Sequence, residues 1–223
     1  MVQSILIIGR IHEAGLDILR ARPGVSLEIM ASPAEADILA LAPTADAIIV
    51  RTTKLTAAAI DSAPKLKIVS RHGVGYDNVD MAALDRRRIP LTLVGNVNAL
   101  PVAEHALFMM LTIAKRGVAY DRATRNGDWK IRDSFGGTEL AGKTLLLLGF
   151  GRIGREVARR AQVFGMTVLS YDPYVRDAAM FAARVQPVAK LAEALPQADF
   201  ISVHLPLTAE TKAIIGPQQF AAM

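Results

Sequence analysis

The sequence contains no cysteine, so it can form neither a disulfide framework nor a thiolate nucleophile or metal ligand. It also lacks any apolar stretch near the roughly 18 residues that span a bilayer. The N-terminus has no basic segment, apolar run and cleavage site of the kind that forms a secretory signal. His, Asp and Glu residues nowhere have metal-ligand spacing. We therefore expect a cytoplasmic protein with no membrane partner and no metal.

Aromatic residues make up only 5% of the chain, which bears on how its net charge of +5 is interpreted. Nucleic-acid-binding surfaces combine clustered basic residues with interleaved aromatic ones. Here the basic residues are scattered apart from 86–88, a triplet that is better explained as a solvated helix end. A modest positive field would equally attract a small anionic substrate. We expect no nucleic-acid partner; a nucleic-acid-binding domain would instead show a steep salt dependence of binding.

Between residues 4 and 97, short apolar runs alternate with helical patterns, which is typical of parallel βαβ units. The predicted strands are Ile5–Ile8, Ser26–Met30, Ala47–Val50, Ile68–Ser70 and Leu91–Val94. The predicted helices are Glu13–Arg20, Pro33–Leu41, Thr56–Ser62 and Val79–Arg87. These residues are expected to form an α/β domain over 1–97.

The segment from Asn98 to Arg116 predicts a long helix, with Asn98 as its N-cap and Pro101 in its first turn. Its body is apolar nearly all round, so we expect a buried helix where two domains or two subunits meet. Met109 and Met110 are interpreted as core residues. A second helix is predicted over 118–126, followed by an irregular stretch over 128–142.

A buried strand over 145–148 leads into Gly-Phe-Gly-Arg-Ile-Gly at 149–154 and then into a helical pattern. Gly149 permits a tight turn, Gly151 allows the backbone to approach a pyrophosphate, and Gly154 lets helix and strand pack together. The helix start, with its amides and partial positive charge, suits an anion. The alternative is an ordinary structural turn.

The next predicted strand, Thr167–Tyr171, leads to Asp172, 18 residues beyond Gly154. An acidic residue at about this spacing holds the ribose hydroxyls of NAD in dinucleotide-binding folds. Further strands are predicted near Val185 and over Phe200–His204, with a helix near residue 217. Four strands are fewer than the usual six, so residues 98–223 are interpreted as a dinucleotide-binding domain that is incomplete at its C-terminus.

Together these motifs resemble the D-isomer-specific 2-hydroxyacid dehydrogenase family, in particular its D-3-phosphoglycerate dehydrogenase-like members. The resemblance covers nearly the whole chain. It rests on RHGVGYDNVD (71–80), VAEHA (102–106), LAGKTLLLLGFGRIGR (140–155), FGMTV (164–168), YDPY (171–174) and ADFISVHLPLT (198–208). Several such blocks in the same order are far more specific than a single glycine motif.

The resemblance implies an α/β fold in which a flavodoxin-like substrate (lid) domain precedes a truncated Rossmann NAD-binding domain. It also implies a cleft between the two domains and a homodimer formed largely through the cofactor domain. The implied reaction is hydride transfer between NAD(H) and C2 of a small anionic D-2-hydroxy or 2-oxo acid. Candidate substrates are 3-phosphoglycerate, hydroxypyruvate and glyoxylate. An alternative on the same fold is an NAD-sensing regulatory scaffold.

Site residues follow from the resemblance position by position. An arginine suits a substrate anion because its guanidinium can bind two oxygens at once. Without the resemblance, Arg51 would be taken for a surface residue, and a turn that closes a strand is the alternative for Gly75. The implied substrate-binding residues are Arg51, Arg71, Val74 and Gly75. The implied NAD-binding residues are Val74, Val102, Gly149, Gly151, Arg152, Ile153, Gly154, Asp172, Leu205, Pro206 and Thr211.

No catalytic residue is assigned in this chain. His204 lies at a predicted strand end, which makes it a tempting acid–base, but the family's histidine comes later in the chain. His105 lies on an apolar helix and is interpreted as a packed residue. The family's catalytic arginine, glutamate and histidine all correspond to positions beyond Met223. The chain is therefore expected to be the N-terminal part of an enzyme and to be inactive alone, whereas an intact catalytic set would separate the enzyme from the regulatory scaffold.

Overall fold

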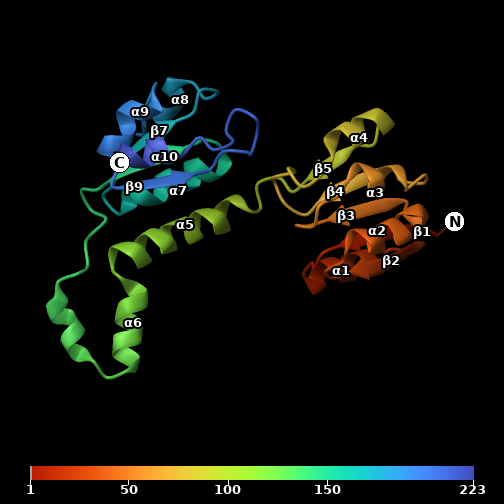
Figure 1. Cartoon of the computed structure of the whole chain (residues 1–223), viewed down its shortest axis with the longest axis horizontal. Helices are drawn as coiled ribbons and strands as arrows, with labels where there is room; N and C mark the ends of the chain where they lie inside the picture. The colour runs from red at the N-terminus through yellow and green to blue at the C-terminus, as the bar shows by residue number, and fades with distance from the viewer. Residues whose placement is uncertain (1) are drawn as a thin grey trace. The chain divides into compact units, whose positions relative to one another are not determined.

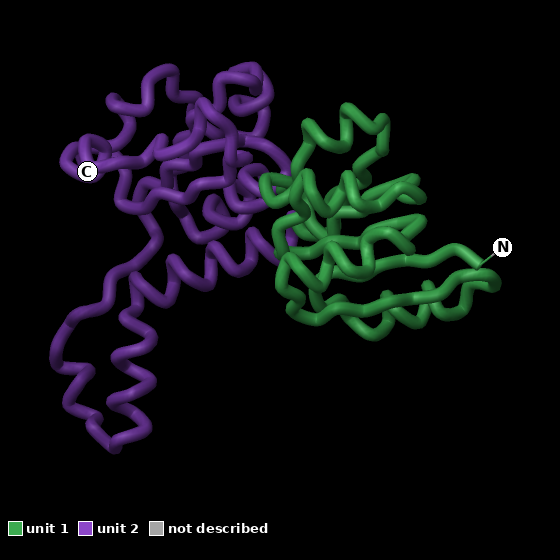
Figure 2. The backbone as a smooth tube through the Cα atoms, turned by 45° about the vertical axis from the view of Figure 1, so that its right-hand side comes forward, with its two compact units in different colours: residues 1–98 green, residues 99–223 purple. Residues whose placement is uncertain are grey.

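The structure is a computed structural model that describes residues 2–223, and the chain divides into two units, residues 1–98 and 99–223 (Figure 2). Both units are α/β, with parallel sheets and helices against them (Figure 1). This agrees with the fold class predicted from the alternation of strand and helix patterns. Each unit is described by itself below.

The first unit is built on a five-stranded parallel sheet with the strand order β2-β1-β3-β4-β5. This is the flavodoxin-like order, as predicted. Its strands are β1 (Gln3–Ile8), β2 (Val25–Met30), β3 (Ala47–Val50), β4 (Ile68–Arg71) and β5 (Leu91–Leu93). Its helices are α1 (Glu13–Arg20), α2 (Glu35–Leu41), the 3₁₀ segment η1 (Ala42–Thr44), α3 (Ala57–Asp61) and α4 (Met81–Arg87).

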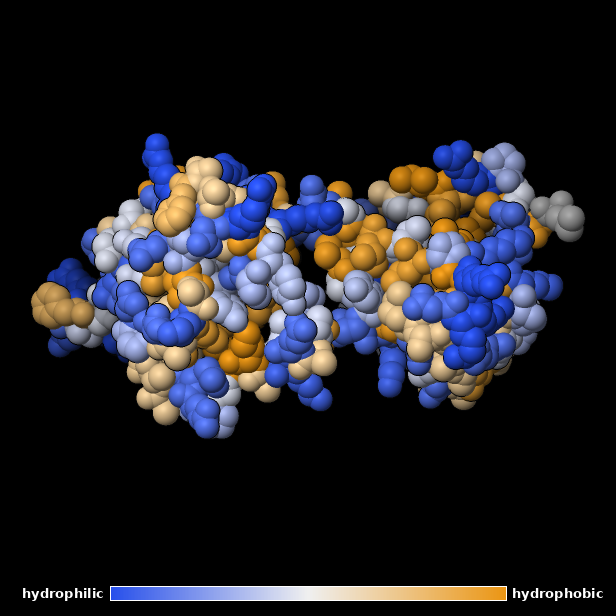
Figure 3. Space-filling view, turned by 90° about the horizontal axis from the view of Figure 1, so that it is seen from above, coloured by the Kyte–Doolittle hydropathy of each residue, from blue (hydrophilic) through white to orange (hydrophobic). Residues whose placement is uncertain are grey.

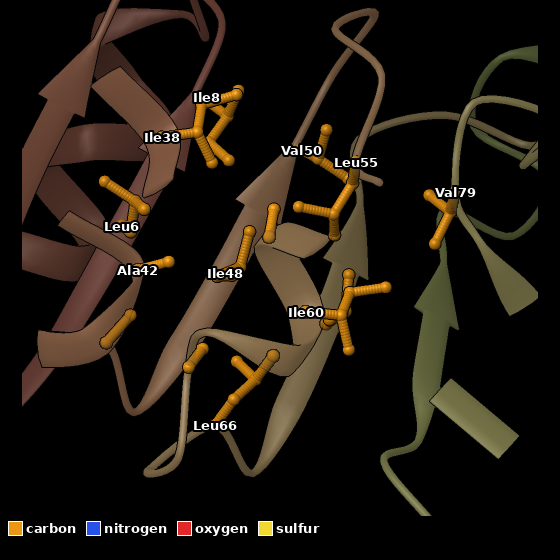
Figure 4. Packing of buried hydrophobic residues seen from close by; sticks show 14 of the residues in the cluster. Leu6, Ile8, Ile38, Ala42, Ile48, Val50, Leu55, Ile60, Leu66 and Val79 are labelled. Atoms are coloured by element: carbon orange, nitrogen blue, oxygen red, sulfur yellow. The ribbon is translucent and has the colours of Figure 1, made fainter. Parts of the chain in front are cut away.

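The core of this unit lies where the central strands β1 and β3 meet the helices. Leu6 and Ile48 belong to the same hydrophobic cluster as Ile38 and Ile60, and all four side chains are buried (Figure 4). Central parallel strands are covered on both faces, so their side chains read as continuous apolar runs rather than as alternating ones. This explains why β1 and β3 were recognisable in the sequence.

The arginine triplet at 86–88 lies at the end of α4, and two of its side chains bind residues of and after α3. Arg86 forms an ion pair with Asp61 (Nη2 to Oδ2, 2.7 Å), and Arg87 donates to the carbonyl oxygen of Ala63 at 2.8 Å. Arg88 adopts the left-handed conformation that terminates the helix. The triplet therefore ties α4 to the end of α3, a contact that its composition did not indicate.

The second unit has a four-stranded parallel sheet in the order β8-β7-β6-β9. This is the order of the first four strands of a Rossmann sheet, 3-2-1-4, as predicted. Its strands are β6 (Thr144–Leu148), β7 (Thr167–Tyr171), β8 (Gln186–Pro187) and β9 (Phe200–Val203). Its helices are α5 (Ala99–Ala114), α6 (Gly117–Arg125), η2 (Trp129–Ser134), α7 (Arg152–Val163), α8 (Asp177–Ala182), α9 (Leu191–Ala194), η3 (Leu195–Gln197) and α10 (Pro217–Ala221).

Strand β6 is the centre of this unit because its side chains serve two cores. Leu145 and Leu147 belong to the cluster that includes α5 and α7, whereas Leu146 and Leu148 belong to the cluster with α9 and η3. All four leucines are fully buried. A strand that is covered on both faces needs this unbroken apolar run, and its position between two helical layers fixes where the following glycine turn lies.

Within the second unit, helix α5 is buried on one face only, and its burial where two domains or two subunits meet stays a prediction. Its small residues Ala103 and Ala106 pack with Met110 in the core beside α7. Met109, predicted as a core residue, is 48% exposed, and Phe108 is 60% exposed. The physical reason is that α5 packs on the second unit's core along a single stripe. Other apolar side chains of α5 reach the surface. Figure 3 shows that hydrophobic residues lie among hydrophilic ones on the surface of the molecule.

Helix α6 and η2 form an arm that projects from the sheet of the second unit (Figures 1 and 2). The predicted irregular stretch over 128–142 thus contains one short helical segment, η2, and its Trp129 is exposed. The short helices α8 and α9 were not predicted, because six and four residues are too few to show a helical period. Within residues 2–223, no helix has both the length and the apolar character that crossing a membrane requires.

Candidate functional site

The carboxyl end of β6 turns sharply into α7 through Gly149. This residue has φ +100°, which favours glycine, and its N–H donates to the carbonyl oxygen of Tyr171 at 2.9 Å. Gly151 is the N-cap of α7, which runs for twelve residues from Arg152. The amino terminus of a full helix, with its partial positive charge, therefore lies at the turn. This arrangement can bind an anion.

The three glycines of the turn differ in what surrounds them. A Cβ on Gly154 would lie 2.1 Å from the carbonyl oxygen of Gly149, and a Cβ on Gly149 would lie 2.8 Å from that of His204. Neither side chain could be accommodated. A Cβ on Gly151, in contrast, would meet nothing within 4 Å. Packing therefore requires Gly149 and Gly154, whereas the space at Gly151 is open to an approaching ligand.

Asp172 lies directly beside the glycine turn. Its Oδ2 accepts a hydrogen bond from the N–H of Phe150 at 2.8 Å, and its Oδ1 accepts one from the N–H of Tyr174 at 3.0 Å. The register explains this proximity, because Leu148 at the end of β6 pairs with Tyr171 at the end of β7. A carboxylate has about four lone-pair sites, so Asp172 retains acceptor capacity for ribose hydroxyls.

The loop after β9 borders the same turn from the other side. The N–H of His204 donates to the carbonyl oxygen of Leu148 at 2.8 Å, which carries the β6–β9 pairing one residue past the strand. Leu205 follows, and its Cδ2 would lie 3.2 Å from a Cβ on Gly149. Thr211 closes the loop, because its hydroxyl accepts from the N–H of Thr208 and donates to the carbonyl of Pro206.

Val102 on α5 lies in a groove between α5 and β9, with a volume of about 540 Å³. His105, Val203 and His204 also line this groove. Since the His204 carbonyl contacts the glycine turn, the groove is continuous with the loop described above. The two remaining predicted residues, Arg152 and Ile153, form the first turn of α7, where Ile153 packs partly against the core.

The predicted substrate residues lie at the carboxyl edge of the first unit's sheet. Arg51 directly follows β3, and Arg71 is the last residue of β4, where it pairs with Val50. Val74 and Gly75 follow in the turn after β4. The topology therefore gathers all four residues at one edge, because parallel strands end on the same side of a sheet.

Asn78 organises this edge, and the sequence analysis did not single it out. Its amide Nδ2 donates to the carbonyl oxygens of Thr53, at 2.7 Å, and Arg51, at 3.3 Å. Its Oδ1 accepts from Nε of Arg71 at 3.1 Å. The only signal for this role was its position within the 71–80 motif. Asn78 thus fixes both the backbone of one arginine and the side chain of the other.

The electrostatics of this edge suit an anion. Burial lowers the pKa of Arg71. The negative charge of Asp77 raises this pKa, whereas the positive charge of Arg51 lowers it further. Two like charges at one edge disfavour each other unless an anion lies between or beside them. A guanidinium offers a planar fork of donors to a carboxylate or phosphate. The edge is therefore a candidate site for an acidic small molecule.

Comparison with known proteins bears on both sites. Residues 107–223 match the NAD-binding domain of the D-isomer specific 2-hydroxyacid dehydrogenases. The chain belongs to this family.

Curated relatives in this dehydrogenase family include D-3-phosphoglycerate dehydrogenase of Methanocaldococcus jannaschii, 36% identical over 99% of this chain and 42% of its own length. The enzyme of the same name from Mycobacterium tuberculosis is 44% identical over 82% of this chain and 35% of its own length. The chain thus spans about two-fifths of these relatives or less. A solved NAD⁺-bound 3-phosphoglycerate dehydrogenase of Entamoeba histolytica matches with a TM-score of 0.82 and 28% identity, over all of this chain and 69% of that one.

Family membership makes NAD the cofactor of the second unit, and the residues at the turn fit it. The glycine turn offers a helix terminus for a pyrophosphate, and Asp172 offers a carboxylate for a ribose. Bound NAD would supply hydride transfer chemistry. Among the described residues, no group of three His, Asp or Glu side chains gathers as metal ligands would.

His204 is partly buried and lies beside a hydroxyl of the strand that it follows. Its Nε2 lies 2.9 Å from the hydroxyl of Ser202, and burial lowers its pKa. Lowering the pKa from its ordinary value of 6.5 leaves the imidazole neutral at pH 7. That His204 is not the catalytic acid–base stays a prediction, because a neutral imidazole is the form that accepts a proton.

We expect Gly154→Ala to affect stability and Gly151→Ala to affect NAD binding. Gly154→Ala should lower the free energy of unfolding by about 1–3 kcal/mol, because its Cβ overlaps a backbone carbonyl. Gly151→Ala should leave stability nearly unchanged but weaken NAD binding, because its Cβ occupies the open side of the turn. Urea denaturation and calorimetric titration measure the two effects. Equal stability loss in both variants would show that the glycine roles have been misassigned.

Protonation of His204 should destabilise the second unit at mildly acidic pH. Because its pKa is lowered in the folded state, the unfolded chain binds more protons between that pKa and 6.5, so stability falls as the pH drops through this window. His204→Gln should reduce the loss measured by urea denaturation between about pH 7.5 and about pH 5.5. Asp199, whose pKa is lowered by Lys143, acts at lower pH. An unchanged pH dependence would contradict the assignment.

Proposed function

We propose that this chain supplies the NAD-binding and substrate-anion sites of an NAD-dependent D-2-hydroxyacid dehydrogenase. The observation that carries the proposal is the hydrogen bond from Phe150 N–H to Asp172, which joins the ribose-binding carboxylate to the glycine turn. Family membership and the dehydrogenase names of the relatives support an enzyme rather than an NAD-sensing scaffold.

In the proposed reaction, hydride passes between NAD(H) and C2 of a 2-hydroxy or 2-oxo acid. The residues of this chain bind and orient. Gly151 and the start of α7 receive the pyrophosphate, Asp172 receives the adenosine ribose, and Leu205 and Pro206 flank the adenine side. Arg51 and Arg71, with the backbone at Val74 and Gly75, receive the substrate anion. Val102 lies near the nicotinamide ribose in this assignment.

Among substrates, 3-phosphoglycerate is the first candidate. The relatives that match at 36–44% identity are named for it, and two arginines at one sheet edge suit a molecule with two anionic groups. Hydroxypyruvate and glyoxylate are the smaller candidates to compare with it. A second arginine should matter less for glyoxylate, because that substrate carries a single carboxylate.

We expect the purified chain to bind NAD more tightly than NADP, because Asp172 accepts from ribose hydroxyls and repels a 2′-phosphate. Asp172→Asn should weaken NAD binding about tenfold, because hydrogen bonds to a charged group are lost, and should also reduce the preference over NADP. Calorimetric titration with both cofactors measures this. Equal affinity of the unmodified chain for the two cofactors would mean that Asp172 has been misassigned.

In the same preparation we expect no turnover of NADH with hydroxypyruvate or glyoxylate, since each residue assigned in this chain binds or positions the substrate or the cofactor. Loss of a general acid–base typically costs about 10²–10⁴-fold in rate. Turnover that His204→Gln abolishes would instead assign proton transfer to this histidine and overturn our assignment of it.

We also propose that the chain self-associates through the exposed apolar side of α5. Ile113 is 69% exposed, and the exposed Met109 lies one helical turn before it on α5. Phe108 on the same helix is exposed as well, and exposed apolar surface of this kind marks an interaction site. Ile113→Lys should convert a dimer to a monomer in light scattering at micromolar concentration. Ile18→Lys on α1, where the side chain is 64% exposed, is the matched control and should leave the dimer intact. A monomeric unmodified chain would contradict this interface.

A further inference from the structure

A hydrogen bond joins the two loops on either side of the glycine turn. The hydroxyl of Tyr174 donates to Oε2 of Glu210 at 2.7 Å, across 36 residues of sequence. Tyr174 lies in the loop after β7, and Glu210 lies in the loop after β9. Since β7 and β9 are the two neighbours of β6 in the sheet, this bond connects the loops that flank the carboxyl end of β6.

Both ends of this bond are fixed by further contacts. The backbone N–H of Tyr174 donates to Oδ1 of Asp172 at 3.0 Å, so the tyrosine is anchored to the carboxylate at the glycine turn. On the other side, Thr208 and Thr211 cross-link the loop that carries Glu210, with Thr208 N–H 2.9 Å from the hydroxyl of Thr211. Glu210 is therefore held relative to Asp172 by a continuous chain of hydrogen bonds.

Two carboxylates act on the phenol of Tyr174. The hydrogen bond to Glu210 raises the pKa of Tyr174, and the charges of Glu210 and, to a smaller degree, Asp172 act in the same direction. Both carboxylates thus lie within electrostatic reach of one phenol. The tyrosine is 80% exposed, so its ring leaves a free face beside the adenosine end of the proposed NAD site.

We propose that Tyr174 and Glu210 form a clasp at the adenosine end of the NAD site, in which Tyr174 holds the Glu210 carboxylate where it repels a 2′-phosphate. Glu210 is then a second specificity-determining residue, beside Asp172, that favours NAD over NADP. The inference rests on the proposed function, because it assumes that adenosine binds at Asp172. It adds a residue that follows β9, on the opposite side of β6 from Asp172.

The size of the effect follows from the exposure of the pair. Two nearby charges interact weakly in water and several times more strongly near a protein surface, where the effective dielectric constant is lower. For an exposed carboxylate the weaker interaction applies, which corresponds to roughly three- to tenfold in affinity. Salt screens exposed charges, so the effect should shrink at about 0.5 M salt. A purely structural role of Glu210 would show no such salt dependence.

The test is calorimetric titration of the purified chain with NAD and with NADP. Glu210→Gln keeps an acceptor for Tyr174 but removes the charge, so it should raise NADP affinity relative to NAD roughly three- to tenfold at low salt, with NAD affinity nearly unchanged. Tyr174→Phe should shift the ratio in the same direction by a smaller factor, because Glu210 is released but stays charged. Glu139→Gln, an exposed residue before the amino end of β6, is the matched control and should change neither affinity.

The outcomes separate this inference from the proposed function. An unchanged NAD-to-NADP ratio in Glu210→Gln, or an equal loss of both affinities, would overturn the clasp while NAD binding itself stands. A ratio shift that persists at high salt would also overturn it, because the effect would not be electrostatic. Absence of NAD binding by the unmodified chain would refute the proposed function, and the clasp with it.

Discussion

The close packing of α7 on the end of β6 is the constraint on which the second unit's site depends. Gly154 lies so near the carbonyl of Gly149 that no side chain fits between them. Because helix and strand meet this closely, the positive end of α7 lies at the carboxyl edge of the sheet. Asp172 then closes the arrangement by accepting from Phe150. A bulkier residue at 154 would move the helix terminus, the turn and the carboxylate partner together.

Parallel topology places the candidate residues of each unit at one sheet edge. Arg51 follows β3 and Arg71 ends the neighbouring β4 in the first unit, whereas Asp172 and Leu205 follow the neighbours of β6 in the second. The residues come from distant parts of the sequence, yet their positions after strand ends bring them together. Polar side chains that were unremarkable in sequence, above all Asn78, then join them by hydrogen bonds.

Helix α5 illustrates the limit of pattern alone. Its sequence is apolar nearly all round, which predicts that at least part of the helix packs against other apolar residues. In this chain the helix packs only along the stripe that includes Ala103 and Met110, and Met109 lies outside it. Which side is buried depends on where α7 and β6 lie, and those positions come from the packing of the whole unit. The composition of α5 therefore predicted that the helix packs against other elements, but it could not predict which side of the helix is buried.

The sequence by itself determined the strand order along the chain, the longer helices, the sheet type, the glycine turn and the carboxylate that follows β7. These are local properties, since apolar periodicity and glycine spacing act between residues a few positions apart. Only the tertiary structure decided that Asp172 accepts from Phe150, that Asn78 ties two arginines together, and that Tyr174 meets Glu210. Exposed polar residues follow no sequence period from which their hydrogen-bond partners could be predicted. Tyr174 and Glu210 are 36 residues apart, and only the folding of the chain brings them together.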